Sequence, residues 1–202
     1  MLLEEKGIRC IDLAFLKRTD MKFDIIFMSS VFHELLSYLS RNEAANTMNV
    51  VLSHLSENGK LIIRDWCAPE DKTLARVEVI PTKIEEVKQW IKELSEHAIF
   101  LSEVVVKGNT IQASVDDLYN ILLHVTWGQQ SILRESNESY LVDSASIKQF
   151  ILNGNQNIKL VSQRAYYQSD YTNYLSNYFK DVEIFVKQYH ICTKQVLVLQ
   201  KA

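Results

Sequence analysis

Glycine is scarce in this 202-residue chain, which contains five of them. No two of these glycines lie within five residues of each other. A nucleotide-binding loop of the GxGxxG or GxxxxGK type needs closely spaced glycines, because its backbone must approach phosphate groups. The sequence therefore excludes a glycine-rich phosphate loop within these residues.

Cysteine is also sparse, and its three positions, Cys10, Cys67 and Cys192, are far apart. An odd count without a CxxC pair fits neither a disulfide framework nor a zinc ribbon. We therefore expect no metal site from the cysteine pattern. A reducing, cytoplasmic compartment is the default expectation for such a chain.

Long apolar runs and an excess of positive charge are missing too. No run approaches the roughly 18 residues that a transmembrane helix needs, and the opening MLLEEKGIRC has two glutamates where a signal peptide would be apolar. The net charge of −3 provides no basic field for nucleic acid or a membrane surface. The length and the 47% hydrophobic content predict one large globular domain, or a domain with an insertion.

Short, nearly continuous apolar runs predict strands at 8–15, 23–29 and 60–66, of the kind buried in a parallel sheet. Residues 42–55 separate the last two and carry apolar side chains at helical spacing. Strand, helix and strand in this order form a right-handed βαβ crossover. The fold class predicted is therefore α/β, with a mostly parallel twisted sheet.

The second half of the chain repeats this theme after a different middle. A helix is expected at 144–153, followed by strands at 157–166, 182–190 and 194–201. The short gap before the last of these favours an antiparallel pair at the sheet edge. The intervening block, 67–135, is predicted to be a mainly helical insertion, with helices in 70–98 and at 115–127. The sheet domain would then comprise residues 1–66 and 136–202.

Four sequence blocks, in order, resemble class I S-adenosylmethionine-dependent methyltransferases of a bacterial and phage-type subgroup. The blocks are FDIIFMSSVFHELLSYLS (23–40), VLSHLSENGKLIIRDW (51–66), TWGQQSILRES (126–136) and RAYYQSDYTNYLS (164–176). The resemblance implies a Rossmann-like sheet, S-adenosylmethionine as cofactor and methyl transfer to an acceptor that the sequence does not identify. It implies neither a membrane nor a nucleic-acid partner.

The same resemblance implies that part of the family's fold is absent from these residues. The family binds its cofactor with a glycine-rich turn upstream of the βαβ unit found here, so the core is expected to be incomplete at its N-terminal side. A second copy or a completing polypeptide would then cover the exposed sheet edge. The alternative is a cofactor-free remnant of the fold that acts as a binding or structural protein.

Five residues are implied to contact the cofactor. Asp12 and Leu13 would face its adenine, and Ser29, Ser30 and Val31 would face its methionine and sulfonium end. Each assignment has an ordinary alternative. Asp12 is equally well an exposed residue at a strand end, and Ser30 is equally well the N-cap of the following helix.

His33 and Arg64 are the candidates for chemistry. An imidazole at His33 can accept a proton from a nucleophile, and a guanidinium at Arg64 or Arg134 can clamp an anionic substrate group. The alternatives are a His33 that only packs or caps, and an arginine paired with an internal carboxylate. The tyrosine-rich stretch 166–178 is interpreted as a packed lid rather than a surface that stacks on bases.

Overall fold

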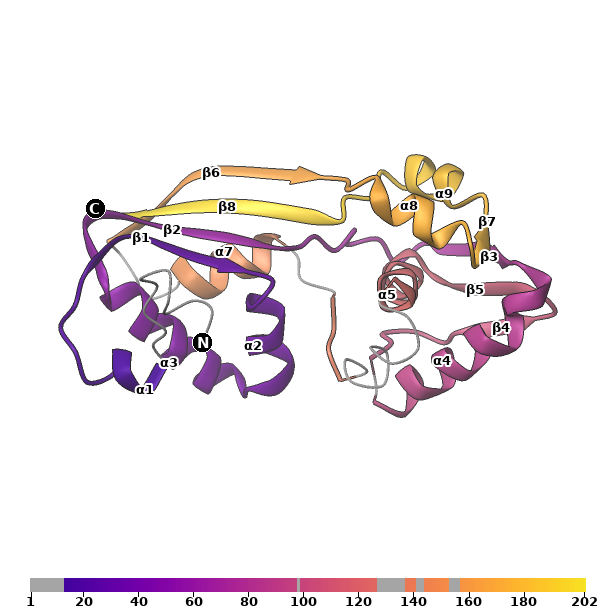
Figure 1. Cartoon of the computed structure of the whole chain (residues 1–202), viewed down its shortest axis with the longest axis horizontal. Coiled ribbons are helices and arrows are strands. Elements are labelled where there is room, and N and C mark those ends of the chain that lie inside the picture. The colour runs from indigo at the N-terminus through magenta and orange to yellow at the C-terminus, as the bar shows by residue number, and fades with distance from the viewer. Residues whose placement is uncertain (1–12, 98, 127–136, 141–143, 153–156) are drawn as a thin grey trace, which may run out of the picture.

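The computed structural model describes residues 13–97, 99–126, 137–140, 144–152 and 157–202 (Figure 1). Four strands form sheet A in the order β1-β2-β8-β6, namely β1 (Phe23–Ser29), β2 (Leu55–Trp66), β8 (Lys194–Lys201) and β6 (Ile158–Tyr166). β1 and β2 are parallel, whereas β8 is antiparallel to both of its neighbours. The α/β class is thus confirmed, but sheet A is mixed rather than mostly parallel.

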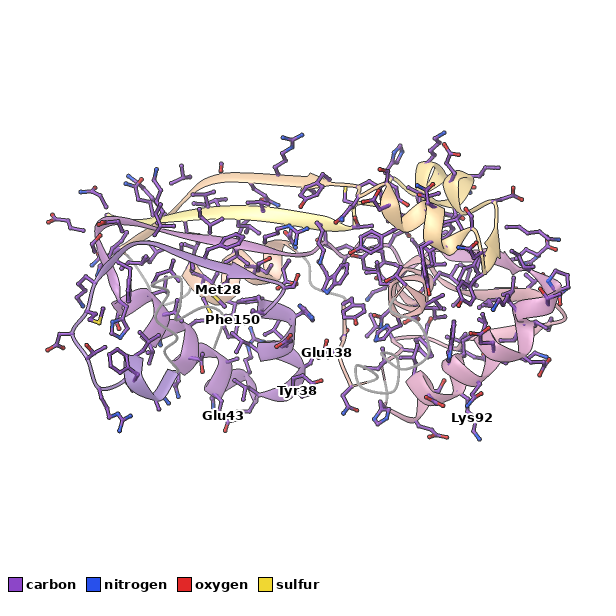
Figure 2. The ribbon with its side chains drawn as sticks, viewed as in Figure 1. Met28, Tyr38, Glu43, Lys92, Glu138 and Phe150 are labelled. Carbon is purple, nitrogen blue, oxygen red and sulfur yellow. The ribbon has the colours of Figure 1, made fainter. Side chains whose placement is uncertain are left out.

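Among the described residues, α2 (Phe32–Tyr38), α3 (Arg41–Ser53) and α7 (Ser144–Leu152) lie against one face of sheet A, and α1 (Leu13–Leu16) lies on the same side, beside α3 (Figure 1). Side chains from this face and from the helices form the first hydrophobic core, in which Phe32, Leu61, Ile63 and Leu197 are fully buried. Figure 2 shows Met28 of β1 and Phe150 of α7 on the helix-covered side of sheet A, where they belong to this core. We call this half of the structure the first lobe.

The opposite face of sheet A has no helix over it in the part of the chain that the structure describes. Strand side chains alternate between faces, and those of Ile25 and Phe27 are 62% and 58% exposed. Ile62, the register partner of Phe27 on β2, is only partly buried. A sheet covered on both faces would bury all three side chains, so this face is left as an apolar surface.

A second sheet and, in the part of the chain that the structure describes, five helical segments form the second lobe (Figure 1). Sheet B is antiparallel and has the order β4 (Val105–Lys107), β5 (Thr110–Ser114), β3 (Leu74–Val79) and β7 (Phe179–Lys180). The segments are the 3-10 turn η2 (Pro81–Lys83), α4 (Ile84–Glu96), α5 (Val115–Val125), α8 (Asp170–Leu175) and α9 (Val182–Gln188).

The helix α5 is the centre of the second lobe, since every one of its residues is buried. Its Asp117 carboxylate is fully buried and accepts hydrogen bonds from the amides of Leu101 (2.8 Å) and Ser102 (2.9 Å) and from the Ser114 hydroxyl (2.8 Å). A buried carboxylate is tolerated when donors surround it in this way. Asp117 therefore ties the loop before β4 to the start of α5.

The predicted strand at 182–190 is wrong, because its residues form α9. Val182 and Phe185 are buried on one helix face while Ile184 is 60% exposed. This i, i+3 burial is the helical period, whereas the apolar run alone indicated a strand. The strand at 8–15 lies largely outside the described residues, and its last part, from Leu13, belongs to α1 instead.

The other predicted strands, 23–29, 60–66, 157–166 and 194–201, are confirmed, as are the helices at 42–55, 115–127 and 144–153. β2 is longer than expected because the Asn58-Gly59 pair sits inside it as an irregularity, where the register jumps from Phe23↔Leu55 to Ile25↔Lys60. The described part of the block 67–135 holds the strands β3, β4 and β5 besides its helices. Of these, β3 and β5 were not predicted from the sequence. The division of the chain into domains at these boundaries stays a prediction.

Among the described residues, no helix is both long enough and apolar enough to cross a membrane.

Candidate functional site

The carboxyl ends of β1 and β2 meet at one edge of sheet A, next to the second lobe. Ser29 is the register partner of Arg64, and the amide of Ser30 donates to the carbonyl of Arg64 at 2.7 Å. Ser30 has φ of 52°, a left-handed conformation that turns the chain sharply from β1 into α2. The site residues predicted on the two strands are therefore brought together.

Asp65 organises this edge. Its fully buried carboxylate accepts from the amides of Phe32 (2.8 Å), His33 (3.2 Å) and Trp66 (2.7 Å), and lies 2.8 Å from Nδ1 of His33. Burial alone would raise the pKa of the Asp65 carboxyl, but the hydrogen bonds and charge of His33, with the backbone donors, hold that pKa below its ordinary value. Asp65 is thus ionised at neutral pH.

Asp65 also caps α2, which corrects one of the alternatives for Ser30. The N-cap residue of α2 is Val31, and its side chain makes no capping bond. The first helical amides, of Phe32 and His33, are satisfied instead by the carboxylate of Asp65 from β2. A negative charge at this position also complements the helix dipole.

The buried His33 imidazole is held between two carboxylates. Because an ionised carboxylate only accepts hydrogen bonds, Nδ1 of His33 must carry the proton shared with Asp65. Its other nitrogen, Nε2, lies 3.4 Å from Oε2 of Glu138. The ring also packs edge-on against Trp66 and Tyr140, with centroids 6.1 and 5.5 Å away. The His33 side chain thus packs against two aromatic rings and also contacts two carboxylates.

Lys194, the first residue of β8, is a member of the site that the sequence did not indicate. Its Nζ lies 3.2 Å from the Ser30 hydroxyl and 3.0 Å from the centroid of the Trp66 ring. Burial lowers the pKa of Lys194 to about 8, although the nearby Asp65 carboxylate opposes this shift. No local pattern distinguishes Lys194, because an antiparallel strand from far along the chain delivers it.

Among the described residues, the contacts of Arg64 are neither with an anionic group nor with an internal carboxylate, the two partners considered from the sequence. Its Nε donates to the Tyr166 hydroxyl at 2.9 Å, and one terminal nitrogen lies 3.4 Å from Oε1 of Gln168. These contacts attach β2 to the end of β6. Arg64 is half-buried and stands beside Ser29 at the strand edge, so its position is compatible with an anionic ligand.

The remaining predicted residues are less informative. Val31 is 39% exposed at the turn, Leu13 begins α1, and Asp12 and Arg134 lie outside the described residues. Within the tyrosine-rich stretch, Tyr171 packs on Trp66 with centroids 6.0 Å apart, as expected of a packed lid.

Two open grooves, of about 640 and 720 Å³, lie in the second lobe rather than at this edge. One runs between sheet B and α9, and the other between α8 and α9. Neither is lined by the residues that were predicted to contact the cofactor or the acceptor, although the second is lined in part by the tyrosine-rich stretch. The described polar groups at the carboxyl ends of β1 and β2 form a network of hydrogen bonds centred on Asp65.

No protein-family model matches the chain, and no curated protein matches it. Among solved structures, the chain is similar to an S-adenosylmethionine-dependent methyltransferase from Clostridium acetobutylicum ATCC 824. The two share 10% sequence identity, the match covers 99% of this chain and 68% of that chain, and the TM-score is 0.43.

Proposed function

We propose that the chain carries part of the site for S-adenosylmethionine-dependent methyl transfer, working in the intact protein or with a completing polypeptide. The observation that carries this proposal is the pairing of Ser29 with Arg64 at the carboxyl ends of two parallel strands. Open α/β sheets bind their ligands at this edge. The sequence resemblance assigns the same residues to the methionine end of the cofactor.

The residues present fit that end of the cofactor. Ser29 to Val31 form a sharp turn whose backbone faces the strand edge, and the Ser30 hydroxyl is already in contact with the ammonium of Lys194. An ammonium at this point favours a ligand that carries a carboxylate, and the amino-acid portion of S-adenosylmethionine has one. The resemblance also assigns Asp12 and Leu13 to the adenine end, but Leu13 begins α1 rather than ending a strand, so this part of the assignment has no support from the fold.

His33 and Arg64 would act on the acceptor. When bound, S-adenosylmethionine supplies an electrophilic methyl on its sulfonium, and the acceptor's lone pair forms the new bond as the carbon–sulfur bond breaks. Arg64 would orient an anionic acceptor, and His33 would lie beside the reacting atoms. Positioning supplies most of the catalytic effect for a nucleophilic acceptor, so a base is not required.

Titration of S-adenosylmethionine into the chain, followed by calorimetry, tests this function. For these residues alone we expect a dissociation constant of about 1 mM or weaker, because losing two or three charge-assisted hydrogen bonds costs several orders of magnitude. Ser30→Ala should weaken binding further, whereas Ser53→Ala, at an exposed helix end, should not. Micromolar binding by the chain alone would contradict the incomplete site, and no saturable binding at about 10 mM would contradict the function.

A cofactor-free binding protein is the second candidate, and the uncovered face of sheet A favours it. Ile25 and Phe27 present their side chains to solvent on an edge strand, since the described neighbour of β1 is β2 alone. Exposed apolar faces and edges of this kind are covered by partners in stable proteins. We propose that a second copy or a completing polypeptide covers this surface in either function.

A further inference from the structure

One cluster of ligand-type side chains stands at the junction of the two lobes. His33 and Glu34, from the first turn of α2, meet Glu138, from the segment 137–140. One ligand atom from each of the three lies within 4.8 Å of the other two. His33 and Glu138 are buried, with 4% and 8% exposure, whereas Glu34 is exposed. The cluster therefore has a closed inner side and an outer side open to solvent.

The orientation of His33 directs a lone pair into this cluster. Nδ1 carries the proton that is donated to Asp65, so a neutral ring presents an unshared pair at Nε2. That nitrogen faces Oε2 of Glu138, itself an acceptor, at 3.4 Å. Two acceptors this close in a buried place require a proton or a metal cation between them.

Glu138 is positioned so that one carboxylate oxygen stays directed at His33. The Tyr38 hydroxyl donates to Oε1 of Glu138 at 2.8 Å, and the other oxygen, Oε2, lies 3.4 Å from Nε2 of His33. Figure 2 shows Tyr38 and Glu138 next to each other. The next amide, of Ser139, donates to the Ser37 hydroxyl at 3.1 Å, and that hydroxyl donates to the carbonyl of His33 at 2.9 Å. Side chain and backbone thus both attach the segment to α2.

This arrangement has the form of a metal site with its supporting shell. Metal-binding histidines commonly donate their second N–H to a carboxylate, which fixes the tautomer and the ring orientation, and Asp65 does this for His33. Three protein ligands with one side open is the usual form of a site that keeps a water or substrate position. One nitrogen and two carboxylate ligands suit Zn²⁺ or Mn²⁺ better than Ca²⁺ or Mg²⁺, which prefer oxygen alone.

We propose that His33, Glu34 and Glu138 bind a divalent transition-metal ion, with Asp65 as the positioning residue behind His33. The cysteine pattern gave no indication of this, because the proposed ligands include no cysteine and come from segments about a hundred residues apart. The ion would join α2 of the first lobe to the segment that leads from the second lobe. The proposal does not depend on cofactor binding or on methyl transfer.

The test is titration of Zn²⁺ into the tag-free chain after treatment with a chelator, using competition with a chromophoric indicator. We expect one ion per chain with micromolar or tighter affinity. Glu138→Gln and Glu34→Gln should each weaken binding at least tenfold, and Asp65→Asn should weaken it about 10- to 100-fold. Glu96→Gln, at an exposed position on α4, is the matched control and should bind as the unaltered chain does.

Co²⁺ provides a second measurement at the same site. Trp66 lies close to His33, with ring centroids 6.1 Å apart, so bound Co²⁺ should quench part of the tryptophan fluorescence. Quenching should be lost in Glu34→Gln, whose exposed position leaves the fold intact, as circular dichroism without metal would verify. Failure to bind Zn²⁺ at about 1 mM, or binding that none of these substitutions weakens, would overturn the proposal. If no Zn²⁺ binds and the metal-free His33 ring carries a proton on both nitrogens, a proton rather than a metal ion lies between Nε2 and the Glu138 carboxylate.

Discussion

Nδ1 of His33 and Oδ1 of Asp65 are 2.8 Å apart, and this bond joins the first turn of α2 to the end of β2. The same carboxylate accepts three backbone amides and is fully buried. It therefore stabilises a helix start, a strand end and an imidazole at once. Its loss should affect the fold as well as any chemistry at this edge.

Asp65→Asn should lower the free energy of unfolding by about 3 kcal/mol or more at pH 7, because it removes one member of a buried, hydrogen-bonded pair. Urea unfolding monitored by circular dichroism measures this change. Asp24→Asn is the control, since Asp24 is exposed and accepts one hydroxyl, from Ser56 at 2.6 Å. Equal effects of the two substitutions would contradict the role assigned to Asp65.

Lys194 should make stability depend on pH in an alkaline window. Its pKa in the folded chain is about 8, below the ordinary value of 10.5, so between these values the unfolded chain binds the extra proton. The contribution of Lys194 to the free energy of unfolding therefore rises with pH across this window. Below about pH 8 the cost of burying the charged lysine is fully present. The unfolding free energy of the unaltered chain, minus that of Lys194→Met, should therefore increase from pH 8 to pH 10.5. Lys159→Met, at an exposed position on β6, should show no such trend.

Gly59→Ala should be more costly than Gly108→Ala. A Cβ at Gly59 would meet backbone atoms of Ser56 and Phe23 at 2.9 to 3.0 Å, which cannot move aside without disturbing the β1–β2 register. Gly108 has φ of 57° but open space around it, so alanine there costs only backbone strain. We expect losses of about 3 and about 1 kcal/mol respectively in chemical unfolding. The reverse order would contradict the irregularity described in β2.

Ser40→Ala should remove a complete capping box at the start of α3. The Ser40 hydroxyl accepts from the amide of Glu43, and the Glu43 carboxylate accepts from the amide of Ser40. Such a substitution costs about 1 kcal/mol, measurable as a lower midpoint of thermal unfolding. Ser53→Ala, at the other end of the same helix, should cost less, and an unchanged midpoint for Ser40→Ala would argue against the cap.

Phe27→Asp should abolish self-association if a second copy covers the open face of sheet A. A charge at this 58% exposed position opposes apolar contact across the face while leaving the first core intact. Analytical ultracentrifugation of both proteins over a concentration series measures the effect. Leu74→Asp is the control, because Leu74 is 64% exposed in the second lobe. A chain that remains monomeric throughout excludes the second copy and leaves the completing polypeptide.

The periodicity of apolar residues was sufficient to locate several strands and helices. The apolar runs located β1, β6 and β8, and helical spacing located α3 and α5. It failed at α9, where Ile184, Phe185 and Val186 form a continuous apolar run although the buried residues, Val182 and Phe185, have helical spacing. The short gap before β8 indicated an antiparallel strand at the sheet edge; β8 is antiparallel, but it lies between β2 and β6. That central place, and the pairing in sheet B, depend on contacts between distant segments.

The candidate site was also predictable only in part, because some of its residues come from distant segments. Ser29 and Arg64 lie on two strands that a βαβ unit places side by side, and Ser30 and His33 follow Ser29 in the turn and in the first turn of α2, so the sequence brought them to one edge. Lys194 and Glu138 arrive from segments 164 and about a hundred residues away, to contact Ser30 and Tyr38 respectively. No motif marks such residues. Asp65 was adjacent to a predicted residue, but its four donors became evident only in three dimensions.

The position of β8 in sheet A determines the order in which the two lobes can fold during synthesis. β8 (Lys194–Lys201) follows every other strand in the sequence, yet it lies between β2 and β6 in the middle of sheet A. During synthesis on the ribosome, β2 and β6 emerge without the strand that joins them, so sheet A cannot close until Lys201 has left the exit tunnel. The second lobe, whose strands and helices end at Gln188, needs none of β8 for its own pairing and can form first. Nascent chains that stop before Lys194 should therefore expose the apolar edges of β2 and β6 and be targets for chaperones.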